Sequence, residues 1–226
     1  MKKIIALILA MLMLATGLVA CTDGNDEIPA DTTANEDIST TPEEDVTTDE
    51  ITEPVVELPY SSAVELLQIV FDGYNATATD ETKLYVGGGN INNFDTVNPE
   101  GPAAFVALAD SDYNDNLGIP ESEVSKIASA ASMFNLMNTN NFNCYTIQFA
   151  AGTDVDASIN AIKENILGRQ WICGSPEKLV IVKLPGDYIL VVWGAVNYGG
   201  VVDPFVASVA TLVDGAATAV EHTFAQ

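Results

Sequence analysis

The stretch "LVIVKLPGDYILVVW", residues 179–193, decides the fold class of this chain. Two apolar runs rich in Val, Ile and Leu lie on either side of Pro185-Gly186-Asp187. β-Branched and aromatic residues favour strands, and a Pro-Gly-Asp group between two such runs favours a turn. The stretch therefore predicts a β-hairpin with strands at residues 179–184 and 188–193.

Further strands and helices are expected on both sides of this hairpin. Apolar periodicity near 3.6 residues indicates helices, and short β-branched runs bounded by turn residues indicate strands. Strands are expected at residues 83–86, 132–137 and 142–150, the last two joined by a turn at residues 138–141. Helices are expected from Ser62, at residues 102–109, at residues 121–131, after Thr153 and after Asp203.

The expected helix ends follow from capping chemistry. Ser62 and Glu65 have the spacing of a capping box, and Gly73 is a plausible stop for the helix they begin. Gly168 ends the helix that Thr153 caps. Asp203 and Pro204 are expected at the N-cap and N1 of the last helix. Its apolar stripe is expected at Val206, Val209, Ala210, Val213, Ala217 and Val220.

Helices and paired antiparallel strands alternate along the chain without a regular βαβ repeat. This order predicts an α+β fold, a single domain in which helices pack on a mostly antiparallel sheet. The domain is expected to span residues 59–226, and 168 residues suffice for one apolar core.

Residues 1–20 have the order of a secretory signal. Lys2 and Lys3 precede an unbroken apolar run of 12 residues, 4–15, which is shorter than the ~20 residues a membrane-spanning helix needs. The tetrapeptide Leu18-Val19-Ala20-Cys21 resembles the lipobox of bacterial lipoproteins. This resemblance implies cleavage after Ala20 and a diacylglycerol on Cys21. The alternative is an ordinary signal peptide with an incidental cysteine.

Residues 22–58 are expected to form an acidic tether behind Cys21. They contain 13 Asp or Glu residues, many Thr, no Lys or Arg and no aromatic residue. Such a segment buries too little apolar surface to offset its ordering entropy, so we expect disorder. A flexible chain of this length spans ~35 Å on average. The tether would hold the domain clear of the outer face of the cytoplasmic membrane.

The charge balance excludes some partners. Residues 59–226 carry 19 acidic and 6 basic residues, a formal charge of −13. A domain this acidic is repelled by nucleic acid and by anionic headgroups. Membrane contact is therefore expected through the lipid anchor, and an extracytoplasmic protein or wall ligand remains as the partner.

Residues ~60–212 resemble the uncharacterised domain of unknown function 4358, found in lipoproteins of Gram-positive anaerobes. The matching pieces are the first helix, "LGIPESEV" (residues 117–124), "CYTIQFAAG" (144–152), the helix after it, and "PEKLVIVKLPGDYILVV" (176–192). The resemblance implies a fold and a surface location, and it implies no activity.

The stretch "DSDYNDNLGIPE", residues 110–121, partly fits a calcium loop. Asp110, Asp112, Asn114 and Glu121 take positions 1, 3, 5 and 12. Asp115 stands where the loop needs Gly, and Pro120 precedes the expected bidentate glutamate. The preferred interpretation is a solvated acidic loop, with calcium as the alternative.

The sequence contains few side chains suited to nucleophilic catalysis or to metal binding. Cys144 and Cys173 could form a disulfide, worth ~3.5 kcal/mol across 28 intervening residues, or remain two buried thiols. The sole histidine, His222, lies near the C-terminus, so no cysteine–histidine pair or zinc site is expected. No catalytic residue and no cofactor is therefore predicted.

Four aromatic residues admit two interpretations. Trp171, Trp193, Tyr188 and Tyr198 could line a ligand groove, although packing in the core and the hairpin is preferred. The leading functional hypothesis is a non-catalytic, lipid-anchored binding or scaffolding module. The alternative is an extracytoplasmic carboxylate-based hydrolase or a calcium-dependent binding module.

Overall fold

The computed structural model of the chain describes residues 58–172, 174–197 and 200–225. The predicted signal peptide, Cys21 and the tether up to residue 57 lie outside the described residues, as do Cys173 and Tyr198. No helix within the described ranges is both long and apolar enough to cross a membrane.

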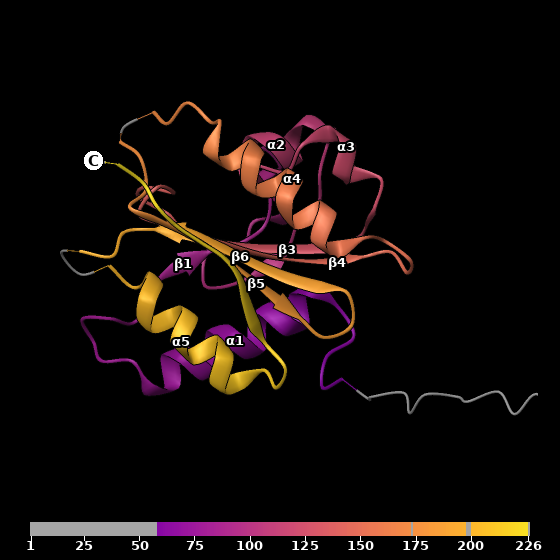
Figure 1. Ribbon diagram of the computed structural model, residues 1–226. Coiled ribbons are helices and arrows are strands. Elements are labelled where there is room, and N and C mark those ends of the chain that lie inside the picture. Colours follow the sequence, from indigo (N-terminus) through magenta and orange to yellow (C-terminus); the bar gives the residue numbers. More distant parts are fainter. Residues whose placement is uncertain (1–57, 173, 198–199, 226) are drawn as a thin grey trace, which may run out of the picture. The chain divides into compact units, whose positions relative to one another are not determined.

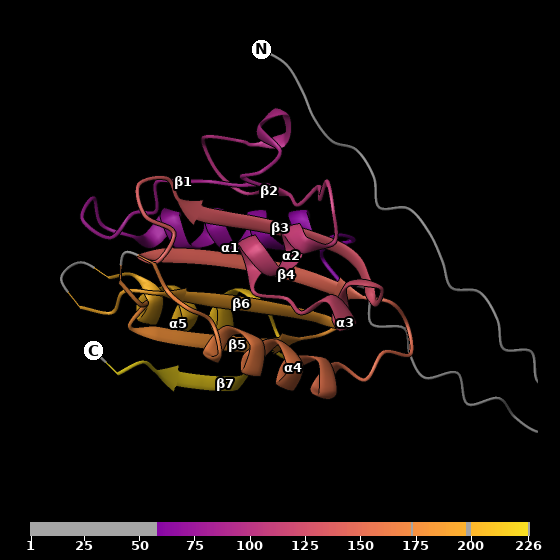
Figure 2. The same cartoon turned by 90° about the horizontal axis from the view of Figure 1, so that it is seen from above.

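The described part is an α+β domain built on a seven-stranded antiparallel sheet, as predicted. The strands lie side by side in the order β1-β3-β4-β6-β5-β7, and β2 also pairs with β3 (Figure 2). The strands are β1 (Val86–Gly87), β2 (Ala103–Ala104), β3 (Ile127–Asn135), β4 (Phe142–Phe149), β5 (Lys178–Leu184), β6 (Tyr188–Gly194) and β7 (Ala217–Thr223).

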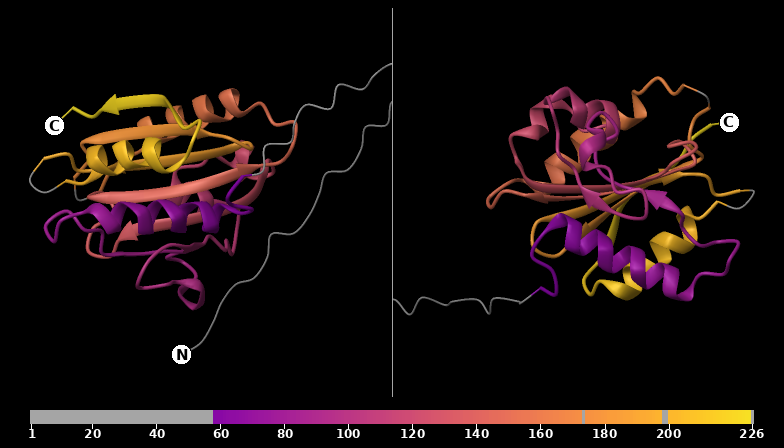
Figure 3. Two further views of the ribbon diagram at one scale, coloured as in Figure 1. Left: turned by 90° about the horizontal axis from the view of Figure 1, so that it is seen from below. Right: turned by 180° about the vertical axis from the view of Figure 1, so that it is seen from behind.

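Helices cover both faces of the sheet (Figure 1). One face carries α1 (Ala63–Thr77) and α5 (Val202–Leu212). The other carries α4 (Val155–Leu167), beside the short helices α2 (Ser111–Leu117) and α3 (Glu121–Val124). A 3₁₀ turn, η1 (Phe94–Thr96), lies in the loop between β1 and β2. The view from behind in Figure 3 shows the same three layers.

The predicted hairpin is confirmed as β5 and β6, which pair from Lys178 opposite Gly194 to Leu184 opposite Tyr188. Gly186 and Asp187 take left-handed backbone, with φ of 74° and 61°, which closes the turn after Pro185. The carbonyl of Asp187 also accepts a hydrogen bond from the Phe149 N–H at 2.9 Å. The hairpin turn is thereby joined to β4.

Side chains of the central strands alternate between two apolar cores. Cys144, Val180 and Val192 pack toward α1 and α5. Tyr145, Ile181 and Val191 pack toward α4. All seven residues of β6 are buried, because neither face of this strand meets water. The double cover explains why residues 188–193 read as a continuous apolar run rather than an alternating one.

The helix expected at residues 121–131 is wrong beyond Val124. α3 ends there, and β3 begins at Ile127 and pairs with β4 over most of its length. The Ala and Ser residues of this segment suit a helix locally, but sheet pairing overrides such weak preferences. The small side chains let the backbone of α1 approach, and the Ser129 hydroxyl accepts a hydrogen bond from the Ala63 N–H at 3.2 Å.

The last predicted helix is also too long. α5 ends at Leu212, and Ala217 and Val220 belong to the edge strand β7 instead. Gly215, at φ 78°, reverses the chain between them. At the other end Val201, not Asp203, is the N-cap.

Three smaller boundaries also differ from the prediction. Residues 102–109 form no helix, and within them only the short strand β2 (Ala103–Ala104) is regular. Of the strand expected at residues 83–86 only Val86 pairs, within β1. Asp154, not Thr153, caps α4, accepting from the Ala157 N–H at 3.0 Å. α4 itself ends at Gly168 as expected.

Gly73 does not stop the first helix, which Ser62 caps as predicted and which continues to Thr77. A Cβ at Gly73 would lie 2.6 Å from Leu212 Cδ2, so the glycine instead provides for the close contact of α1 with α5.

Gly88 fixes the β1 segment against β3. A Cβ there would lie 2.4 Å from both the Ala103 nitrogen and the Ser132 carbonyl oxygen, which are backbone atoms and cannot rotate away. Gly88→Ala is therefore expected to lower the free energy of unfolding by about 1–3 kcal/mol, measured by urea denaturation. Gly168→Ala is the control, because its nearest heavy atom is 3.3 Å away and its φ is −77°. Equal losses in the two variants would contradict the account.

Candidate functional site

A pocket of about 270 Å³ lies on the α4 side of the sheet, beyond the C-terminal ends of α2 and α4. We call it the Arg169 pocket. Its lining draws on β3, β4, β6, the end of α2 and the segment that follows α4. Among the lining residues are Asp115, Asn140, Asn143, Arg169, Trp171 and Trp193.

One row of paired strand residues forms the floor of the Arg169 pocket. Asn143 of β4 lies opposite Phe134 of β3 and opposite Trp193 of β6. All three are buried, with Asn143 4% exposed and Trp193 2% exposed. The Asn143 Nδ2 donates to the Asn116 carbonyl at 3.4 Å, which holds the amide under the end of α2.

The two helix ends above this floor are joined to each other. Gly118 ends α2 in left-handed backbone, at φ 66°, and a Cβ there would lie 2.6 Å from Ile166 Cγ1 of α4. The Asn165 Nδ2 of α4 donates to Asn114 Oδ1 at 2.8 Å and to the Gly118 carbonyl at 2.9 Å. The C-terminal ends of the two helices are therefore held together.

Arg169 follows directly after α4 and reaches across the pocket wall. Its Nη2 donates to the Asp115 carbonyl at 2.5 Å. The guanidinium carbon lies 5.3 Å from the Trp171 ring centroid and 5.9 Å from that of Trp193. Cation–π contacts with two indoles hold the guanidinium in one place without neutralising its charge.

The rim is fixed by the turn between β3 and β4. The Asn140 Nδ2 donates to the carbonyls of Ile172 and Gly174, at 2.8 and 2.6 Å. Ile172 itself is 80% exposed, and Ile91 of the lining is 41% exposed. Apolar side chains therefore lie exposed at the mouth of the pocket.

Unpartnered polar atoms concentrate at this pocket. Within the described ranges, seven buried side-chain polar atoms lack a hydrogen-bond partner, and four belong to pocket-lining residues. These four are Arg169 Nη1, Trp171 Nε1, Trp193 Nε1 and Asn143 Oδ1. A fifth, the Tyr145 hydroxyl, belongs to a ring that packs against Trp193. Each buried polar group without a partner costs roughly 1–3 kcal/mol, so their clustering needs an explanation.

Arg169 is the one arginine of the sequence, and no carboxylate of the described part lies within 4.0 Å of its side-chain nitrogens. Burial lowers the pKa of its guanidinium from the ordinary value, and the nearby Tyr145 and Asp115 oppose this effect. An arginine stays protonated under such shifts. The pocket thus holds a positive charge without a paired carboxylate, in a domain whose net charge is strongly negative.

A larger hollow of about 430 Å³ beside β1 shows no comparable arrangement. Its Glu177 carboxylate accepts from the N–H groups of Val196 and Asn197 at 2.6 and 2.7 Å, so this charge is already hydrogen-bonded. None of its described lining residues carries a buried unpartnered side-chain atom.

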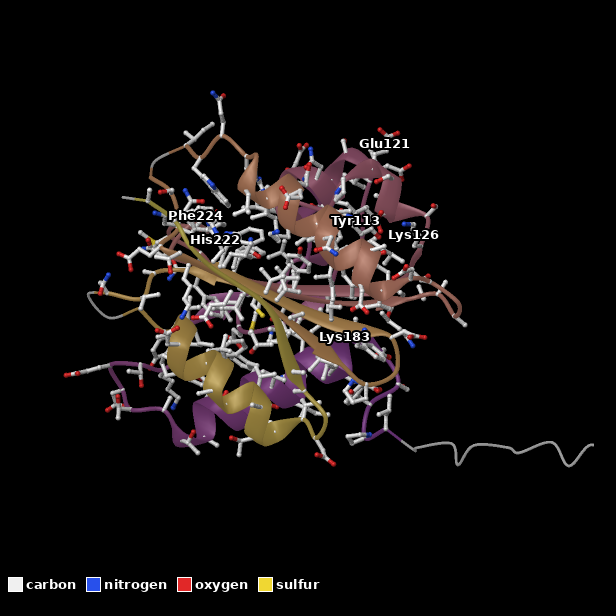
Figure 4. All side chains as sticks on the ribbon, viewed as in Figure 1. Tyr113, Glu121, Lys126, Lys183, His222 and Phe224 are labelled. Carbon is white, nitrogen blue, oxygen red and sulfur yellow. The ribbon has the colours of Figure 1, made fainter. Side chains whose placement is uncertain are left out.

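The predicted calcium ligands are not brought together into one cage. Asp112 and Asn114 lie within α2 and Asp110 just before it, so the three side chains point around a helix rather than toward one centre. Glu121, the first residue of α3, is exposed on the outer side of that helix (Figure 4). Among residues 58–172, 174–197 and 200–225, no group of three His, Cys, Asp or Glu side chains could hold a metal ion. Calcium binding stays a prediction.

Asp112 instead ties the β1–β2 loop to α2. Its carboxylate accepts from Asn90 Nδ2 at 2.8 Å, Asn92 Nδ2 at 2.9 Å and the Leu108 N–H at 2.7 Å. The hydrogen bonds from Asn92 and then Leu108 hold the pKa of this carboxyl at about 2, below its usual 3.8. The residue that the calcium pattern singled out therefore has a structural use.

The remaining described candidates, Cys144 and His222, are not among the residues that line the pocket. Cys144 is fully buried between the sheet and α1, and burial raises the pKa of its thiol well above the usual value. Its partner in the proposed disulfide, Cys173, lies outside the described residues, so this pairing stays a prediction. His222 lies on β7, its ring against Phe224 (Figure 4).

The structure separates the aromatic residues for which a ligand groove and core packing were both considered, and a ligand groove stays a prediction. Trp171 and Trp193 line the pocket, whereas Tyr188 packs edge-on against Tyr60 in the core on the α1 side. Sequence reasoning missed Arg169 and Asn143. A single arginine two residues before a tryptophan, and an amide within an apolar strand, were the available signals.

Comparisons of the chain with protein-family models, with curated proteins and with solved structures found no match. The resemblance to the domain of unknown function 4358 therefore stays a prediction.

The Asp112 hydrogen bonds predict a pH-dependent stability. Because the folded-state pKa is below the unfolded value, the contribution is complete above about pH 4 and is lost as pH falls toward about 2. Asp112→Asn should lower the free energy of unfolding by about 1–3 kcal/mol at pH 7, and the difference from wild type should shrink toward pH 2. Urea denaturation at several pH values measures both.

The control for Asp112→Asn is Glu121→Gln on the neighbouring helix α3. Glu121 is exposed, so its substitution should change stability by no more than about 0.5 kcal/mol at pH 7. An Asp112→Asn difference that stays constant down to pH 2 would contradict the assignment.

Proposed function

We propose that the protein is a non-catalytic, lipid-anchored binding module on the outer face of the bacterial cytoplasmic membrane, and that the Arg169 pocket is its binding site. The observation that carries this proposal is the clustering of Arg169, Trp171, Trp193 and Asn143, with their unpartnered polar atoms, around one pocket. Ligand sites are typically concave, mostly apolar and equipped with a few convergent polar groups.

The chemistry of the lining favours binding over catalysis. Asp115 is the one carboxylate among the described lining residues, and no His, Cys, Lys or Glu accompanies it. A glycosidase needs two facing carboxylates, and nucleophilic catalysis needs a nucleophile beside a base. The Ser132 hydroxyl already donates to the Gly89 carbonyl at 2.7 Å and accepts from its N–H at 3.0 Å. The described lining therefore lacks the pair of reacting groups that a hydrolase would need.

The predicted anchor and tether complete the proposal. Each buried CH₂ of an acyl chain contributes about 0.8 kcal/mol, so two chains hold a protein at a membrane where one is marginal. A tether of residues 22–58 would let the domain present its pocket beyond the lipid surface, up to ~120 Å away when fully extended.

Lipid attachment is tested by replacing the predicted acylated residue. In a bacterial host fed labelled fatty acid, the wild-type chain is expected to carry the label and to fractionate with membranes. Cys21→Ala should carry no label and retain residues 1–20. Label on Cys21→Ala would contradict the anchor, and Cys144→Ala is the control because that buried thiol lies in the core.

The binding role is tested with the purified full chain and a mixture of small acids, sugars, amino acids and wall peptides. Native mass spectrometry should detect a retained compound that is released chemically unchanged. Trp171→Ala should lose it, whereas Tyr85→Ala, which removes an exposed aromatic outside the pocket, should keep it. Retention of no compound, or release of a converted product, would contradict a non-catalytic binding module.

A further inference from the structure

We propose that the Arg169 pocket recognises a carboxylate group carried on a small, largely apolar body. The carboxylate belongs either to a free small acid or to the C-terminal residue of a peptide, and the recognition chemistry is the same for both. This inference rests on the proposed binding function and specifies its ligand.

The unpartnered atoms of the pocket call for an acceptor. Three of the four are N–H donors: Arg169 Nη1, Trp171 Nε1 and Trp193 Nε1. An ionised carboxylate is an acceptor with two oxygens and about four lone-pair sites, so its accepting capacity matches three N–H donors. Hydrogen bonds between an ionised donor and an ionised acceptor are roughly twice as strong as neutral ones.

The charge of the pocket selects a monoanion. Arg169 is the one basic residue among the described lining residues, and the acidic Asp115 lies beside it. A single carboxylate adds one negative charge to a lining that Arg169 and Asp115 leave formally neutral. Phosphate dianions or dicarboxylates would bring a second negative charge into a domain of formal charge −13, and the repulsion grows with the ligand's charge.

The walls and the size of the pocket define the rest of the ligand. Trp171, Trp193 and Phe134 provide aromatic surface, and Ile91 and Ile172 are exposed at the mouth. A volume of about 270 Å³ falls just below the range of ~300–1,000 Å³ typical of drug-sized ligands. It suits one small acid or one terminal residue. The Asn143 Oδ1 remains as an acceptor for an N–H of that ligand.

The chain carries its own reporter of this site. Trp171 and Trp193 are the two tryptophans of the whole sequence, and both line the pocket. Intrinsic tryptophan fluorescence of the full chain therefore reports on the Arg169 pocket alone. Aliphatic probes are needed, because they do not absorb where tryptophan does.

The test is a fluorescence titration of the purified full chain with N-acetyl-leucine and with N-acetyl-leucinamide. The two probes have the same shape and differ in the terminal carboxylate. N-acetyl-leucine is expected to change the emission and saturate, and the amide to bind at least tenfold more weakly. This comparison uses the wild-type chain, so it does not depend on the folding of any variant.

Variants that each remove one positive charge, inside or outside the pocket, then show which residue contacts the carboxylate. Arg169→Gln should weaken N-acetyl-leucine binding about tenfold to a hundredfold, the range for losing a charge-assisted hydrogen bond. Arg169→Lys keeps the charge but not the planar donor fork, and should recover only part of the affinity. Lys83→Gln removes one exposed positive charge outside the pocket and should leave the affinity unchanged.

Three further probes distinguish the sources of the carboxylate. Binding of N-acetyl-leucine and of a peptide ending in leucine, without binding of free leucine, would support a peptide C-terminus. Binding of free leucine or of 4-methylpentanoate would support a free small acid.

Other outcomes would overturn the inference. Equal binding of the amide, preference for inorganic phosphate, or affinity unchanged in Arg169→Gln would each do so. If sugars or other neutral compounds were retained in a Trp171-dependent way while no carboxylate bound, the binding function would stand and this ligand class would be wrong. If no compound bound at all, the binding function and the carboxylate assignment would both be wrong.

Discussion

Helices cover both faces of the sheet, and this double burial constrains the features that matter for function. β6 has no exposed residue, and the neighbouring β4 has one side chain, Gln148, that is even partly exposed. A polar group on these strands must therefore find a partner or remain unsatisfied at a cost. Thr146 finds one, donating to the Ala63 carbonyl at 2.7 Å. Asn143 Oδ1 and Trp193 Nε1 find none, and these two paired residues line the Arg169 pocket.

Much of the fold could be predicted where one local signal agreed with the tertiary structure. The β5–β6 hairpin has strand formers on both sides of a turn group, and α4 has an apolar stripe that ends at Gly168. The errors fall where local and tertiary preferences disagree. Residues 127–131 are small enough for a helix but pair with β4. Residues 217–223 continue a helical spacing by chance and add an edge strand to β5. Strand pairing between distant segments is not visible in a local window.

The site was harder to predict than the fold, since its residues come from segments far apart in the sequence. Trp171 and Trp193 could be proposed as groove residues from their type. Arg169 and Asn143 gain a meaning only when the fold brings the segment after α4 and strand β4 to one pocket. Asp112 shows the opposite error. Its spacing to Asp110 and Asn114 suggested a metal loop, whereas its carboxylate accepts hydrogen bonds from Asn90, Asn92 and Leu108. A helix through residues 111–117 separates side chains that the linear pattern placed together.

A predicted lipid anchor and tether thus precede a domain whose one arginine lies beside two tryptophans and among donors without partners. The central proposal is that these donors bind a carboxylate. Nuclear magnetic resonance tests it most directly, because a ¹⁵N-labelled chain with two tryptophans has two indole N–H signals. On titration with N-acetyl-leucine both signals should shift downfield and saturate together, as the N–H groups gain a charged acceptor. Indole signals that do not move at saturating N-acetyl-leucine, or that move equally with N-acetyl-leucinamide, would contradict the claim.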